Sequence, residues 1–540
     1  SVGISLNRRT DHFNFFTQMG LGHRSLPRYN KGANFDIENN SEIRTDGVNY
    51  RNEKFYNLTL GTDYHINNLN VLTLSGSFAY EVEDQPSNTQ YNAYDNNVLS
   101  SSWIRTETTK ADNPKWQYEL NYDRIFKDNE KHNLVVSAIG SFFGKDQSSY
   151  FTNKANFGTI AENDQKNTTN FKQADYTFKA DYTKPFNKKY TIETGAQYLI
   201  NDVGNDYATS DLINDEWVLN NQLTNNFEYD QKVLGVYGTG SYEGEKWGLK
   251  AGVRLENTSL FTQQHRTGQV NNNHYTNLFP SLHTSYKLSA EVSLQLGYSR
   301  RIYRPRLWDL NPFFNNSNNY NIRTGNPDLN PEYSDSYELT GIFKLGKATL
   351  NSSLYYRYTT AVIERVSTFE NNVSITKPYN VGTSGAPGLE MNGRYSPIGW
   401  LSFNGDFNFN YFKRKGTFQS QIFDFNGNRW SGRLTTKIDL PADFAVELNG
   451  NYQSAYKSVN ATNTAFSYLD AGVRKKLWKG KLVANLSVND IFASRIFESE
   501  TSRPQFYIFN QSYRGRFFTF GLSYGFGKGE AMTYSGGRRR

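Results

Sequence analysis

Apolar and polar residues alternate along much of this chain with the two-residue period of a β-strand. In the stretch 401–411, Leu401, Phe403, Phe407, Phe409 and Tyr411 fall on one face, while Asn404, Asp406, Asn408 and Asn410 fall on the other. The stretches 350–358 and 445–452 repeat the pattern. Because successive side chains of a strand point to opposite faces, each stretch predicts a strand with one apolar and one wet face.

Short and long connections alternate between these strands. Short polar turns are expected at 10–12, 67–70, 127–132, 187–189, 243–246, 289–291, 346–347, 396–399, 441–443 and 479–481. Most of the intervening connections are long, with 144–170 and 201–226 as examples. A soluble sandwich has no reason to keep its long loops on every second connection, whereas outer-membrane barrels have short periplasmic turns and long extracellular loops. We therefore predict an all-β, transmembrane antiparallel barrel whose apolar faces meet lipid.

The strand count predicts that this chain forms an incomplete barrel wall. Ten turns have twenty flanking strands, and the segment 505–526 adds one, which gives about 21 in this chain. Single-chain bacterial barrels have even strand numbers, so the whole barrel is expected to have about 22. Residues 2–7 should then run in the same direction as the last strand. An ascending strand from upstream of Ser1 or from another chain should separate the two.

The domain prediction follows from this count. Residues 1–526 are expected to form the barrel, and 527–540 a periplasmic tail. A signal peptide and a plug are expected to lie outside this sequence, because SVGISLNRR reads as the middle of a strand.

Composition agrees with a membrane barrel. Only 37% of residues are hydrophobic and the mean hydropathy is −0.72, yet aromatics reach 16%, which argues against disorder. No run of about 18 apolar residues could form a spanning helix, and there is no cysteine. The net charge of +7 is scattered apart from Arg538–Arg540, which is expected to be a solvated tail and not a nucleic-acid site.

One stretch is more specific than the strand pattern. It reads YSRRIYRPRLWDLNPFF at 298–314 and continues as NIRTGNPDLNPEYSDSYEL at 321–339. It resembles the paired-strand signature of TonB-dependent receptor barrels, within the outer-membrane-protein β-barrel family that carries a plug and a regulatory-like domain upstream. The positions that match are Arg304, Pro305, Leu307, Leu310, Gly325, Asn326, Pro327, Leu329, Pro331, Glu332, Tyr337 and Glu338. Within this family, the resemblance places the chain near the branch of SusC-like glycan importers but not inside it, because the loops of that branch are usually longer.

Two interpretations of this signature remain open. Prolines lack ladder donors and fix φ, so Pro305, Pro312, Pro327 and Pro331 favour a stiff brace at the barrel rim over a ligand site. Arg301 falls on the lumen side by parity. It could contact a plug or an anionic solute, although a salt-bridged lumen arginine is the simpler interpretation.

The sequence contains no pattern typical of an enzyme. His265, His274 and His283 are the only histidines near one another, and their spacing fits no zinc motif. We therefore expect no catalytic residue, no metal and no cofactor.

The resemblance implies a receptor that binds a scarce solute at its extracellular loops and imports it through a plugged lumen. Its expected partners are outer-membrane lipid, the plug, the TonB energising complex, and a surface lipoprotein or other envelope proteins; nucleic acid is not expected. The alternative is an architectural barrel in a multi-protein outer-membrane complex without transport activity.

Overall fold

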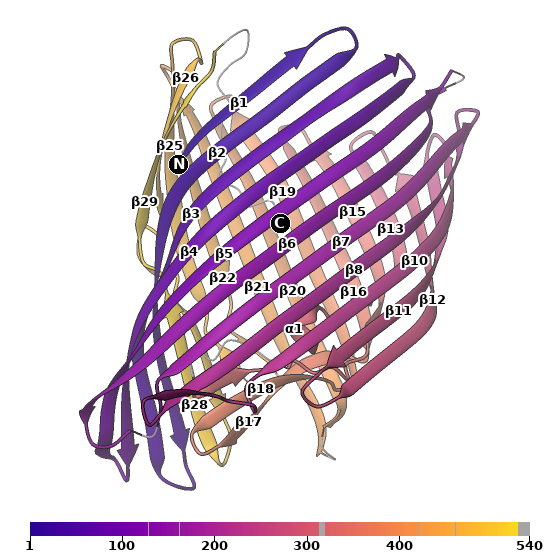
Figure 1. Cartoon of the computed structure of the whole chain (residues 1–540). Coiled ribbons are helices and arrows are strands. Elements are labelled where there is room, and N and C mark those ends of the chain that lie inside the picture. The colour runs from indigo at the N-terminus through magenta and orange to yellow at the C-terminus, as the bar shows by residue number, and fades with distance from the viewer. Residues whose placement is uncertain (128, 161, 313–318, 419–420, 459–460, 527–540) are drawn as a thin grey trace.

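The computed structural model describes residues 1–540 except 128, 161, 313–318, 419–420, 459–460 and 527–540. In this described part, twenty-one antiparallel strands follow one another around the wall of a barrel (Figure 1). In wall order they are β1 (Val2–Arg9), β2 (Phe13–Asp36), β3 (Ser41–Asn67), β4 (Asn70–Asp95), β5 (Val98–Phe126), β6 (Asn129–Phe157), β7 (Gln165–Phe186), β8 (Tyr190–Ile213), β10 (Asn225–Glu243), β11 (Trp247–Gln264), β12 (Gln269–Lys287), β13 (Val292–Tyr303), β15 (Glu332–Leu345), β16 (Ala348–Thr360), β19 (Thr383–Ile398), β20 (Leu401–Phe418), β21 (Gln421–Leu440), β22 (Phe444–Gln453), β25 (Phe466–Leu477), β26 (Leu482–Asn489) and β29 (Phe517–Tyr524). The predicted fold and the predicted count of about 21 are confirmed.

Smaller elements sit at one end of this wall. The helix α1 (Leu307–Leu310) and the strands β14 (Asn321–Arg323), β17 (Ile363–Glu370) and β18 (Val373–Asn380) belong to two connections between wall strands. The strands β9 (Glu216–Leu219), β23 (Tyr456–Lys457), β24 (Thr462–Asn463), β27 (Phe497–Ser502) and β28 (Phe506–Tyr513) extend the wall locally. No helix in the described residues is long and apolar enough to cross a membrane.

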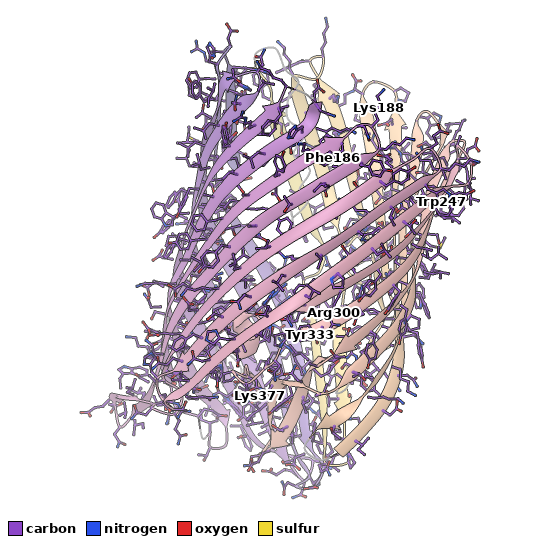
Figure 2. The ribbon with its side chains drawn as sticks, turned by 90° about the vertical axis from the view of Figure 1, so that its right-hand side faces the viewer. Phe186, Lys188, Trp247, Arg300, Tyr333 and Lys377 are labelled. Atoms are coloured by element: carbon purple, nitrogen blue, oxygen red, sulfur yellow. The ribbon has the colours of Figure 1, made fainter. Side chains whose placement is uncertain are left out.

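The ten expected turns lie together at one end of the barrel, and each joins two consecutive wall strands within a few residues of its predicted position. Residue 128 of the third turn lies outside the described residues. Figure 2 shows Phe186, Lys188 and Trp247 at this end and Lys377 toward the opposite one. We call the two ends the turn end and the loop end. The expected placement of 144–170 and 314–332 opposite the turns 67–70 and 479–481 is confirmed for their described residues.

The prediction of long loops is wrong in one respect, because most of the residues assigned to these loops form strands. β6 continues to Phe157 and β7 begins at Gln165, so 144–170 is mainly a hairpin, and β8 likewise continues to Ile213. The outward face of these extensions lies beyond the lipid belt, so the sequence turns polar there while the backbone ladder persists. The prediction took the polar composition of these residues as the sign of a loop.

The outward face carries an apolar belt. The even-numbered residues Phe518, Phe520, Leu522, Tyr524 and Phe526 are 59–71% exposed. In the stretch 401–411 the apolar face is less uniform: Phe409 and Tyr411 are exposed, while Leu401, Phe403 and Phe407 are half-buried by neighbours on the same face. None of the five is buried in a protein core, as a lipid-facing surface requires.

The last predicted strand, 505–526, is divided into β28 and β29. β28 pairs with the loop-end half of β2, Tyr29 opposite Tyr513, and closes that half of the wall. β29 pairs with β26 alone, and β1 with β2 alone. No hydrogen bond joins β1 to β29 within the described residues, and both strands run toward the turn end. The turn-end half therefore has an open seam, as the odd strand count predicted.

Candidate functional site

Two connections at the loop end turn into the barrel and cross its lumen. They are residues 304–331, between β13 and β15, and residues 361–382, between β16 and β19; we call their described part the inner cap. Its β14, β18 and β17 form a three-stranded sheet, with β14 parallel to β18. The hairpin between β17 and β18 turns on Asn371 and Asn372, both with positive φ, which asparagine tolerates better than most residues.

One side of the inner cap is anchored by apolar packing. Leu307 and Leu310 of α1, together with Leu329, are buried against the lumen face of β7, β8, β10 and β11. The wall residues of this cluster are Phe171, Val203, Phe227, Tyr229 and Leu260. Full burial of a leucine side chain stabilises by about 1.5–3 kcal/mol. Three leucines therefore hold this side firmly in place.

The opposite side is anchored by an aromatic slot and hydrogen bonds. Tyr320 contacts the buried, stacked rings of Tyr91 and Trp103, and its hydroxyl donates to Glu162. Burial and the Glu162 carboxylate both raise the pKa of Tyr320, so its hydroxyl keeps its proton at neutral pH. Asn34 of β2 donates its amide to the carbonyl oxygens of Tyr320 and Asn372, at 2.8 and 2.9 Å.

Further contacts reach two other parts of the wall. Phe369 of β17 stacks on Phe506 of β28 with ring centroids 4.6 Å apart, and Glu364 of β17 pairs with Arg414 of β20. The inner cap thus touches β2, β4, β7, β10, β20 and β28, which surround the lumen. Only a segment inside the barrel can touch all of them, so the inner cap spans the loop-end mouth.

The residues of the sequence signature lie in or beside the inner cap. Arg304 donates from Nη2 to Glu256 Oε2 at 2.6 Å and to Thr258 Oγ1 at 2.9 Å, both on β11. Pro305 is buried, and Leu307 is in the apolar cluster.

The second half of the signature joins the parts of the inner cap to one another. A Cβ at Gly325 would lie 2.4 Å from the Asn311 carbonyl oxygen, so only glycine fits there. Asn326 donates from its backbone to Asp309 and from its side chain to the Pro378 carbonyl at 3.0 Å. The Pro327 carbonyl accepts from Asn271 of the wall.

The signature ends where β15 begins. Pro331 is buried, and the Glu332 carboxylate accepts a hydrogen bond from the backbone of Ile363 at 2.5 Å. Arg301 is exposed and shares the parity of Tyr303, whose hydroxyl donates to Asp309 of α1; it therefore faces the lumen. No carboxylate among the described residues pairs with Arg301. Residues 313–318, which follow Pro312 and include Phe314, lie outside the described residues.

A polar chamber lies on the turn-end side of the inner cap. Its volume is about 500 Å³. Lining residues include Arg28 and Asn49 from β2 and β3, Ser87 and Tyr91 from β4, Glu107 from β5, and Arg323 from the inner cap. The wall residues precede or follow Asn34 and Tyr91 toward the turn end, so the chamber lies beneath the side of the inner cap that these two residues hold.

Paired charges stiffen the wall beside this chamber. The buried carboxylates of Glu53 and Glu83 lie opposite each other on β3 and β4. Arg24 and Arg51 pair with Glu53, and Arg51 also pairs with Glu83 at 2.6 Å. Buried carboxylates are tolerated only when they are paired in this way. No set of three or more metal-ligating side chains occurs in the described residues.

Sequence reasoning missed the β17–β18 hairpin of the inner cap. Part of the signal was present, because 373–380 alternates and follows an Asn–Asn pair, the type of turn that joins two strands tightly, although the apolar residues of 363–370 do not alternate. The apolar contacts of α1 with the far wall gave no signal in the sequence.

The family comparison matches most of the barrel. The description "Outer membrane protein beta-barrel family" fits residues 124–524. The chain belongs to this family. Its location in the outer membrane, predicted from the strand pattern, follows from that membership. No curated protein sequence matches the chain.

Solved structures share the fold of this family member at low sequence identity. The siderophore receptor PiuA from Acinetobacter baumannii is 10% identical, with a TM-score of 0.58 over 95% of this chain and 81% of PiuA. The copper transporter OprC is 12% identical, with a TM-score of 0.55 over 92% and 80%. The unliganded ferric citrate transporter FecA is 11% identical, with a TM-score of 0.55 over 91% and 78%. The chain therefore has the barrel fold of outer-membrane receptors and transporters.

Proposed function

We propose that this barrel imports a scarce solute through its lumen as a TonB-dependent receptor. The observation that carries the proposal is the inner cap, which crosses the mouth and leaves a polar chamber of about 500 Å³ behind it. A purely architectural barrel gains nothing from such a chamber, whereas an importer needs a place behind its mouth where the solute can bind. Arg323, Arg28 and Glu107 supply hydrogen-bonding and charged groups for a polar solute.

A plug, in this chain or another, is part of the proposal. Barrels of about 22 strands enclose a lumen too wide for their own side chains to fill. Asp406 and Arg433 illustrate this, since they form an ion pair between adjacent strands on the lumen face, yet their side chains remain 62% and 56% exposed. A plug drawn by the inner-membrane energising complex would open this path in a controlled way. Arg301 is available on the lumen face to contact such a plug or an anionic solute.

An ascending strand is proposed to fill the seam between β1 and β29. Without it, the backbone N–H and C=O groups along two strand edges would face hydrocarbon at several kcal/mol each. The signature residues are proposed to brace the inner cap, because Arg304, Gly325 and Asn326 hold it to β11 and to itself. Residues 527–540 are proposed to be a periplasmic tail.

The test locks the inner cap to the wall. Asn372 donates to Ser41 Oγ at 2.8 Å, and the 540 residues contain no cysteine, so a Ser41→Cys/Asn372→Cys pair gives a single cross-link. Uptake is measured in a deletion strain supplied in turn with ferric chelates, copper, saccharides and short peptides. We expect one solute class to depend on the barrel. We expect oxidation of the pair to stop its uptake and reduction to restore it. Neither single-cysteine variant should respond to oxidation, and Asn372→Cys alone also controls for cysteine at this positive φ.

Two results would contradict the proposal. Unchanged uptake through the locked barrel would show that solutes bypass the inner cap. If deletion altered the assembly of other envelope proteins but the uptake of no solute class, the architectural alternative would be favoured.

A further inference from the structure

The strand extensions at the loop end carry a polar cavity. The contacts of the inner cap show which side of the wall this cavity is on. On β7, Phe171 packs beneath α1 in the lumen, so residues of the opposite parity face outward; these include Asn170 and the exposed Tyr176. On β8 and β10, Val203 and Phe227 pack in the lumen by the same argument. Even-numbered residues on these strands therefore point away from the barrel.

Four outward side chains form a row across the strands. Asp146 of β6 lies opposite Asn170 of β7, Asn170 opposite Asp206 of β8, and Asp206 opposite Asn226 of β10. The Asn226 amide donates to the Asp206 carboxylate. His265, beyond β11, donates its backbone N–H to the Asn226 carbonyl and extends the row. The row thus alternates carboxylate and amide groups, which both bind hydroxyls.

A cavity of about 590 Å³ lies over this row, with Asn221, Thr224 and Arg266 from two loops among its lining residues. Gly204 lies one row nearer the belt, where a Cβ would meet only open space, so no side chain covers the surface there.

Beyond the row, the exposed rings of Tyr150 and Trp217 form an edge-to-face pair, 5.5 Å apart, on the same outer surface. Such rings offer apolar faces against which the C–H faces of sugar rings pack.

The height of the row above the membrane selects the ligand. Asn170 is six residues from Tyr176, the nearest exposed aromatic of the belt on β7. Six residues span about 20 Å along a strand, or about 14 Å of height at a tilt of about 45°. The headgroup layer of an ordinary bilayer adds only about 5–8 Å on each side of the hydrocarbon. A simple phospholipid headgroup would therefore end below the cavity.

We propose that this outward cavity binds the saccharide headgroup of an outer-leaflet glycolipid. The lipid anchor would lie along the apolar belt formed by Tyr176 and Phe178, and its sugars would extend up the wall to the row. Hydroxyls would donate to Asp146 and Asp206 and accept from the amides of Asn170 and Asn226. This site is on the opposite surface of the wall from the chamber, so it is independent of solute import.

The experiment uses the full chain, purified in detergent, and native mass spectrometry. The protein is incubated in parallel with lipopolysaccharide that carries a core oligosaccharide, with lipid A that lacks the core, and with the free core oligosaccharide. We expect a retained adduct with the first probe and at least about tenfold less with each of the other two. The Asn170→Ala/Asn226→Ala variant should lower the first adduct about tenfold, the effect of losing two ordinary hydrogen bonds.

A matched control is Asn257→Ala, because Asn257 of β11 is also an exposed polar residue but does not line the cavity. It should bind like the unmodified protein. Heat-dependent gel mobility checks that each variant keeps the folded barrel. Equal adducts with lipid A and with intact lipopolysaccharide, or no effect of the double substitution in a folded barrel, would overturn the proposal. Equal binding of the free oligosaccharide would overturn the membrane source and indicate a site for a soluble glycan.

Discussion

The anchoring of the inner cap can be tested at Leu310, a residue of α1 with no exposed surface. Truncation of a fully buried leucine to alanine costs about 2–5 kcal/mol. Leu310 contacts the wall only when the cap is in place, so this loss weakens docking of the cap more than it weakens the wall. An opening equilibrium shifts tenfold for each 1.4 kcal/mol. Leu310→Ala should therefore raise the open fraction by about 30-fold to about 4,000-fold.

The open fraction can be measured with a thiol probe beneath the cap. Val203 is 2% exposed under α1, and cysteine is a small, nearly apolar replacement for it. In a Val203→Cys background, the rate of labelling by a water-soluble maleimide reports opening when reclosing is faster than the reaction. The matched control is Leu296→Ala, since Leu296 is 56% exposed on the outward face. Equal labelling rates in the Leu310→Ala and Leu296→Ala proteins would refute the anchoring argument.

Three other predictions concern the wall and the signature. Phe520→Lys places a charge on the lipid face and should lower the free energy of unfolding in lipid vesicles by about 2–4 kcal/mol. Thr519→Lys on the lumen face should change this free energy by much less. Equal losses for the two variants, measured by urea titration, would argue against the assigned faces. If one strand is missing between β1 and β29, Leu6→Cys and Phe520→Cys lie at least about 9–10 Å apart and cannot form a disulfide. Leu6→Cys with its register partner Thr17→Cys can, as a gel-shift assay after oxidation would show. Arg304→Ala should speed labelling of Val203→Cys by about tenfold because a part-buried ion pair is lost, and Arg304→Lys should recover only part of this effect.

The wall could be predicted from the sequence because its determinants are local. Two-residue alternation and short polar turns determine which residues form strands and which hairpins they make. Both signals can be recognised in one sequence without an alignment. The turns at 67–70 and 187–189 illustrate this, since each contains asparagine or lysine between two alternating runs. The same reasoning failed at 144–170, where a polar hairpin above the membrane lacks the apolar alternation by which strands are recognised.

The inner cap could not be predicted because its determinants are far apart in the chain. Asn34 and Asn372 are separated by 338 residues, and Tyr320 and Glu162 by 158. Nothing near Asn34 in the sequence indicates a partner of this kind. The proline and glycine content of the signature correctly indicated a stiff segment, but stiffness alone does not distinguish a rim from a lumen.

The two sides of the inner cap differ in what holds them, and this difference bears on how it would open. The α1 side buries leucines against β7–β11, and separating them exposes apolar surface at about 25 cal/mol for each Å². The Tyr320 side depends more on hydrogen bonds from Asn34 and to Glu162, which water can replace at a net cost of about 0.5–1.5 kcal/mol each. A solute that competes for hydrogen bonds near Tyr91 and Arg323 would therefore weaken the Tyr320 side first. The inner cap would then remain attached through α1 while its other side gave access to the chamber.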